Sequence, residues 1–127
     1  MNTDLHRLDR VTEQIIGCAF QVANGLGSGF LEKVYENALV IELLRAGLRI
    51  EQQKSIPVLY RKQVVGDYIA DLLIENSVLV ELKATKLLDE IHMAQCLNYL
   101  RAANLRLCLL INFGRPKIEV KRIINGF

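Results

Sequence analysis

The sequence lacks the features that mark several large classes of protein. None of the apolar runs in its 127 residues approaches the roughly 20 residues needed to span a bilayer. The first ten residues carry Asp4, Arg7, Asp9 and Arg10 around single leucines, and they hold no apolar segment of the signal-peptide kind. We therefore expect a soluble, cytoplasmic protein.

Zinc and thiol redox motifs are also missing. Cys18, Cys96 and Cys108 lie far apart in apolar sequence, and no CxxC spacing occurs. They are expected to be buried, reduced thiols. The net charge of +2 is too small to require a polyanionic partner or to exclude one. The glycine-rich loop Gly25–Gly29 follows a helical pattern and leads to no Gly-Lys-Ser/Thr, which argues against a phosphate-binding nucleotide loop.

What is present indicates one α/β domain over residues 1–127, because the chain is long enough for one core and too short for two. Apolar residues three or four apart predict helices over 5–23, 30–46 and 89–103. The first is expected to stop at Asn24-Gly25, and the third to begin at Asp89 as its cap. Strands are expected over 49–60, 64–74, 78–84 and 105–112, with a last edge strand over 117–124. This order predicts a small mixed sheet flanked by helices.

Three ionisable residues, Asp71, Glu81 and Lys83, stand where the strand pattern predicts core. Glu81 and Lys83 share one face of their strand because side chains alternate. A three-residue turn, Glu75–Ser77, would place Asp71 opposite Glu81 on that face. A two-residue turn would send Asp71 to the other face.

Two carboxylates facing each other in a buried setting need a shared proton or a cation. Hard oxygen ligands suit Mg²⁺ or Mn²⁺, and a nearby lysine can assist a metal-bound water or stabilise charge on a phosphate. The residues therefore fit metal-assisted hydrolysis of a phosphodiester. A salt-bridge cluster, with Lys83 between the two acids, fits the same spacing equally well.

The hairpin with Asp71, Glu81 and Lys83 between helices resembles the PD-(D/E)XK nuclease superfamily, although Ala70 replaces the proline before the aspartate. The stretch Gly29–Tyr35 is similar to the GxxExxY signature of a family in this superfamily. The resemblance runs from about Val11 to Ile124 and implies a restriction-endonuclease-like α-β-β-β-α-β core. It also implies roles: Asp71 and Glu81 as metal ligands, Lys83 as the catalytic lysine, and Glu32 as a further acid.

The helix after the lysine strand adds a second likeness. Gln95 and Tyr99 resemble the QxxxY motif of RecB-type members, and His92 lies three residues before Gln95 on the same helix face. Such a face would touch nucleic acid or support the lysine strand; ordinary polar packing is the alternative.

The resulting prediction is a nuclease that depends on Mg²⁺ or Mn²⁺ and acts on DNA or RNA. The alternative is a non-catalytic scaffold on a nuclease fold, binding nucleic acid or protein. A homodimer is a further expectation, because a small chain with an apolar sheet edge has a surface for self-association. Basic residues that would contact phosphates are Arg101, Arg106, Arg115, Lys117, Lys121 and Arg122.

Overall fold

The computed structural model describes residues 2–126, and side chains from residue 5 onward. Five strands form one sheet in the order β1-β2-β3-β4-β5. The strands are β1 (Ile50–Tyr60), β2 (Gln63–Ile74), β3 (Val78–Lys83), β4 (Leu107–Asn112) and β5 (Glu119–Ile124). Neighbouring strands are antiparallel except for β3 and β4, which are parallel and joined through α3 (Glu90–Ala103). The predicted mixed sheet is thus confirmed.

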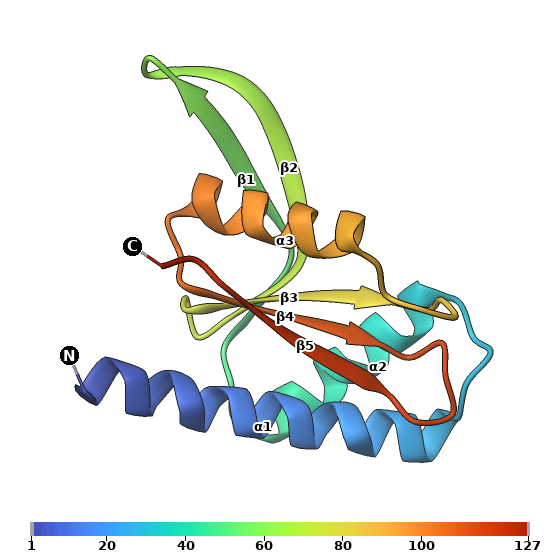
Figure 1. Cartoon of the computed structure of the whole chain (residues 1–127). Helices are drawn as coiled ribbons and strands as arrows, with labels where there is room; N and C mark the ends of the chain where they lie inside the picture. Colours follow the sequence, from blue (N-terminus) through green and yellow to red (C-terminus); the bar gives the residue numbers. More distant parts are fainter. Residues whose placement is uncertain (1, 127) are drawn as a thin grey trace.

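Helices cover both faces of the sheet (Figure 1). The helices α1 (Asn2–Leu26) and α2 (Glu32–Arg45) pack on one face, and α3 packs on the other. Along β3, Val78, Val80 and Leu82 belong to the core beneath α1 and α2, whereas Leu79 belongs to the core beneath α3. Because side chains alternate, Glu81 and Lys83 project to the α3 side.

The apolar run in β4 is buried along its whole length, as expected for a central strand with helices on both faces. The three cysteines are free and buried, which confirms the predicted thiols. No helix among the described residues is both long and apolar enough to cross a bilayer.

The end of the first helix differs from the prediction. α1 continues through Asn24 and Gly25 to Leu26, and the left-handed conformation that stops a helix falls on Gly27, whose φ is 72°. Gly25 keeps helical dihedrals, so a glycine in the pattern did not by itself mark the end. The capping role of Asp89 is confirmed, since its side chain accepts hydrogen bonds from the backbone N–H groups of Ile91 and His92.

The β1–β2 hairpin is longer than the other strands and extends past α3, away from the rest of the sheet (Figure 1). We call its outer part, residues 54–70, the hairpin arm. Several large apolar side chains of the arm are exposed, among them Leu59, Tyr60, Val64 and Val65. Two side chains of the arm's inner half, Ile56 and Ala70, reach into the core under α3.

Candidate active site

The turn between β2 and β3 sets the register on which the site depends. Ile74 pairs with Val78, and Leu72 pairs with Val80, so the turn is the three-residue Glu75–Ser77. The positive φ values of Glu75 and Asn76, 53° and 52°, produce this tight reversal. Continuing the register by one step places Asp71 opposite Glu81, which is the arrangement that a metal centre requires.

At Asp71 and Glu81, hydrogen bonds from backbone N–H groups to side-chain carboxylates take the place of the backbone–backbone bonds between β2 and β3. The Asp71 N–H donates to Glu81 Oε1 at 3.2 Å, and the Leu82 N–H donates to Asp71 Oδ2 at 2.8 Å. On its other side, Asp71 lies opposite Gln53, which the β1–β2 pairing skips and which has a φ of 55°. The regular ladder is therefore interrupted on both sides of Asp71, where the hairpin arm leaves the sheet.

Glu81 is only 5% exposed. Burial and, next, the charge of Asp71 raise the pKa of Glu81 to about 9. The two acids together we call the acid pair. A cation between them would favour the charged form of Glu81, and without one the carboxyl keeps its proton near neutral pH.

Lys83 lies half-buried on the same face of β3 as Glu81. Within residues 5–126 it forms no ion pair with Asp71 or Glu81, whose nearest oxygens lie beyond 4.0 Å. The salt-bridge cluster, in which Lys83 would sit between the two acids, is therefore not what the structure shows. The pKa of Cys96 on α3 is lowered, chiefly by its hydrogen bond with Cys108 and to a smaller extent by the charge of Lys83.

Helix α3 brings Tyr99 over the acid pair. Its ring is buried, and the pKa of Tyr99 is raised to about 12 by burial and by the nearby charges of Glu81 and Asp71. The Gln95 side chain donates to the Tyr99 hydroxyl at 2.9 Å, so these two predicted residues act as a unit. His92 instead caps α3, where its Nδ1 accepts from the Asp89 N–H at 3.3 Å.

The upstream acid is placed differently from what the sequence suggested. Glu32 is exposed at the start of α2, and no contact or electrostatic effect links it to the acid pair among the described residues. Its predicted function therefore stays a prediction. Glu36, one turn later, is 4% exposed and accepts hydrogen bonds from Lys33, Gln52 and Gln53. Through Gln53 it reaches the strand position opposite Asp71.

Sequence reasoning missed Glu36, although its spacing of four from Glu32 placed both acids beside the core face of α2. We expect Glu36→Ala to lower the free energy of unfolding by about 1–2 kcal/mol, because several donors lose a charged acceptor. Glu32→Ala, the matched control one turn earlier, should change it by less than about 0.5 kcal/mol. Urea denaturation followed by circular dichroism would measure both, and equal losses would contradict this assignment.

Asn112 is a second residue that the sequence did not single out. It is fully buried at the end of β4, next to Lys83 in the parallel register. Its Oδ1 accepts from the N–H groups of Thr85 and Gly114, and its Nδ2 donates to Thr85 O and to Glu119 Oε1. Gly114 leaves the needed space, since a Cβ there would lie 2.2 Å from the Thr85 backbone. Asn112 thus fixes the chain directly after the lysine strand.

Removing the Asn112 side chain should lower the stability of the folded protein. We expect Asn112→Ala to lower the free energy of unfolding by about 2–3 kcal/mol, because it leaves buried backbone groups of Thr85 without partners. Denaturant melts measure the loss, and an Asn112→Ala protein as stable as the parent would show that water satisfies those groups instead.

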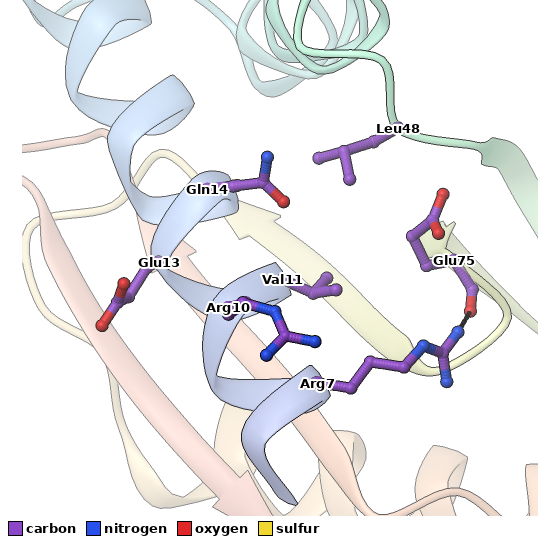
Figure 2. Close-up of a pocket in the computed structure, with 7 residues that line it drawn as sticks. All are labelled: Arg7, Arg10, Val11, Glu13, Gln14, Leu48 and Glu75. Carbon is purple, nitrogen blue, oxygen red and sulfur yellow. Dashed lines mark hydrogen bonds between the residues drawn. The ribbon is translucent and has the colours of Figure 1, made fainter. Parts of the chain in front are cut away.

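One groove of the molecule lies apart from the acid pair. A groove of about 680 Å³ lies between α1 and the β2–β3 turn, where Arg7 donates to Glu75 O at 3.0 Å (Figure 2). The Arg49 backbone and side chain hold the Glu75 carboxylate and lower its pKa. The charges that line this groove are of both signs, Arg7 and Arg10 with Glu13 and Glu75.

Comparison with known families decides the classification. Residues 9–123 match the model of the PD-(D/E)XK nuclease superfamily. The chain belongs to the PD-(D/E)XK nuclease superfamily. Members of this nuclease superfamily generally use divalent metals. The GxxExxY and RecB-type likenesses remain sequence predictions within that superfamily.

Two solved structures share the fold. One is described as the crystal structure of SSO0001, with a TM-score of 0.59, 17% identity, and coverage of 75% of this chain and 50% of the other. The second is an alkaline exonuclease (LHK-Exo) from Laribacter hongkongensis, with a TM-score of 0.55, 12% identity, and coverage of 91% and 69%. This PD-(D/E)XK chain thus spans only half the length of the first. Comparison with curated protein sequences gives no match.

Proposed function

We propose that this PD-(D/E)XK protein is a nuclease that hydrolyses phosphodiester bonds with Mg²⁺ or Mn²⁺. The observation that carries the proposal is the acid pair: Glu81 is buried against Asp71, and no cationic side chain of residues 5–126 neutralises it. Keeping a buried carboxyl protonated beside a second acid costs free energy at neutral pH, and a bound cation would remove that cost by favouring the charged form.

The residues present fit a divalent metal only in part. Asp71 and Glu81 supply the hard oxygen donors that Mg²⁺ and Mn²⁺ prefer. No group of three or more His, Cys, Asp or Glu side chains in the described residues is arranged to hold an ion, so water and substrate oxygens would fill the remaining positions. When bound, the metal would supply a water of lowered pKa and stabilise charge on the phosphate.

The chain's own groups have separate functions in this proposal. Asp71 and Glu81 would hold the ion, and Lys83, on the same face and not paired to either acid, would face the charge that develops on the phosphate. Gln95 and Tyr99, joined by their hydrogen bond, would limit water access from the α3 side. Asn112 would keep the end of the lysine strand in place.

The test is cleavage of single- and double-stranded DNA and RNA by the purified protein. We expect products with Mg²⁺ or Mn²⁺ and none with EDTA. If the folded protein leaves all four substrates intact with both metals, the nuclease proposal fails.

One observation favours the second candidate, a non-catalytic scaffold that binds nucleic acid or protein. Glu32, the acid expected to complete the centre, is exposed and not joined to the acid pair in the described part of the chain. A scaffold would bind oligonucleotides with unchanged affinity after Glu81→Gln and would never cleave them. The predicted homodimer is a separate proposal, which sedimentation velocity would test.

A further inference from the structure

Two hollows lie side by side between α3 and the hairpin arm. One, of about 320 Å³, is lined by Tyr68, Ile91, Ala94, Gln95, Asn98 and Tyr99. The other, of about 540 Å³, is lined by Val58, Leu59, Tyr68, Asn98, Arg101 and Ala102. Tyr68 and Asn98 line both, so the two hollows form one continuous feature, which we call the α3 trough.

The trough is long and open to solvent. Its α3 wall runs from Ile91 to Ala102 along one stripe of the helix, which is about 16 Å at the rise of an α-helix. Its arm wall is the part of the β1–β2 hairpin that extends past α3 (Figure 1). Tyr68, Asn98 and Arg101 are all exposed. An open channel of this length suits an extended chain better than a compact small molecule.

The lining has the chemistry of a site for single-stranded nucleic acid. It contains two tyrosines, two side-chain amides and one cation, Arg101, and it contains no carboxylate. Proteins that bind single strands combine aromatic rings, on which bases stack, with cations along the phosphates. The amides of Gln95 and Asn98 can pair with base edges, which a duplex keeps inside its own base pairs.

Tyr99 lies between the trough and the acid pair. The Tyr68 ring packs on the Tyr99 ring with a centroid distance of 5.1 Å and a tilt of 42°. Tyr99 is buried on α3 over the strand that carries Glu81. A chain lying in the trough would therefore pass directly beside the proposed reaction centre.

We propose that the α3 trough holds a single-stranded segment of the substrate next to the acid pair, with Tyr68 stacking on a base and Arg101 contacting a phosphate. This inference rests on the proposed function, and it names the substrate class as single-stranded nucleic acid or a duplex with an unpaired end. The occupant is the substrate and not a second copy of the chain.

Binding is measured apart from chemistry, by fluorescence anisotropy in EDTA with a labelled DNA single strand and with the same strand in a blunt duplex. We expect the single strand to bind more tightly. Tyr68→Ala should weaken its binding about 5- to 150-fold, the range for loss of one base stack. Tyr68→Leu, which keeps the apolar contact with Tyr99, should weaken it similarly, and Tyr68→Phe should not.

Two matched control variants show whether the loss of single-strand binding is specific to the trough. Tyr60 is an exposed tyrosine at the tip of the arm, outside the trough, so Tyr60→Ala should leave single-strand affinity unchanged. Arg101→Gln should reduce the slope of log affinity against log salt by about 0.7, the value for one single-strand phosphate contact. Arg45→Gln, an exposed arginine on α2 across the sheet, should leave that slope unchanged.

The outcomes separate this inference from the proposed function. If single-strand binding needs Tyr68 but the protein cleaves nothing, the trough is supported as a single-strand site and the nuclease proposal fails. Equal affinity for duplex and single strand would contradict the proposal that the trough binds a single strand. Equal losses of single-strand affinity in Tyr68→Ala and Tyr60→Ala would contradict it too, even if metal-dependent cleavage is found.

Discussion

Glu81→Gln is expected to abolish metal-dependent cleavage, with a loss of at least about 1,000-fold, while making the metal-free protein more stable. The loss follows because the substitution removes one of the two carboxylates proposed to hold the ion. The gain follows because Glu81 is buried beside Asp71, and a neutral amide avoids the cost of keeping that carboxyl protonated above its usual pKa. The amide oxygen can still accept the Asp71 N–H.

The raised pKa of Glu81 fixes the direction in which the stability of the metal-free protein changes with pH. An unfolded chain releases the Glu81 proton near the ordinary glutamate pKa of 4.5, whereas the folded protein holds it up to a pKa of about 9. Between these values the folded state binds more protons, so the stability of the metal-free parent falls as pH rises. Glu81→Gln removes this decline, and at pH 8 it should be more stable by about 1–4 kcal/mol.

Urea melts in EDTA at pH 5 and pH 8, with cleavage assays in Mg²⁺ and Mn²⁺, test both halves of this prediction. Glu13→Gln, at an exposed position of α1, is the control and should change neither quantity. A parent protein whose stability does not change between pH 5 and pH 8 would contradict the burial of an uncompensated carboxyl.

Lys83→Ala is the second large effect, and it should separate catalysis from metal binding. The side chain makes no ion pair among the described residues, so its removal leaves no partner exposed and should change the free energy of unfolding by less than about 1 kcal/mol. Cleavage should nevertheless fall about 100- to 1,000-fold, the cost of losing one group that stabilises transition-state charge.

Mn²⁺ affinity measured by calorimetry should be unchanged by Lys83→Ala, because the acid pair remains. Lys86→Ala, an exposed lysine three residues later, is the matched control and should cleave as the parent does. A large loss of stability in Lys83→Ala without a specific loss of cleavage would support a structural function for the lysine.

Much of the fold could be predicted because local signals and tertiary packing agree. The unbroken apolar run of β4 required cover on both faces, and α3 and the α1–α2 layer provide it. The Asp89 cap followed from elementary helix chemistry, and the edge position of β1 suits its Pro57. The length of the β2–β3 turn stayed open between two and three residues until the structure fixed it. The same turn fixed which acids face each other.

The packing of α2 could not be predicted in the same way. The spacing of apolar residues predicts a stripe of Leu31, Val34, Tyr35, Ala38, Ile41 and Leu44. Of these only Tyr35 is buried, and Leu31 is 81% exposed. The residues that reach the core are Tyr35, Leu39 and Leu43. This segment is apolar on nearly every side, so periodicity could not distinguish the buried face from the exposed one.

Within the candidate site, the residues of the hairpin were predictable and their helical neighbours only partly so. Alternation places Glu81 and Lys83 on one face from sequence alone, whereas the side of Asp71 depended on a turn length that the structure decides. Glu36 and Asn112 depend on long-range contacts with Gln53 and Thr85, which no local pattern reveals. The α3 trough likewise exists only because the hairpin arm extends past a helix that follows it in the chain.

The most direct test of the central claim is a crystal structure of the protein soaked with Mn²⁺ at pH 8, with anomalous data collected for manganese. The account predicts a manganese peak bound by both Asp71 and Glu81, with the Lys83 ammonium near but not bridging them, and no such peak in Glu81→Gln. An acid pair without metal and with Lys83 bridging both carboxylates would contradict it.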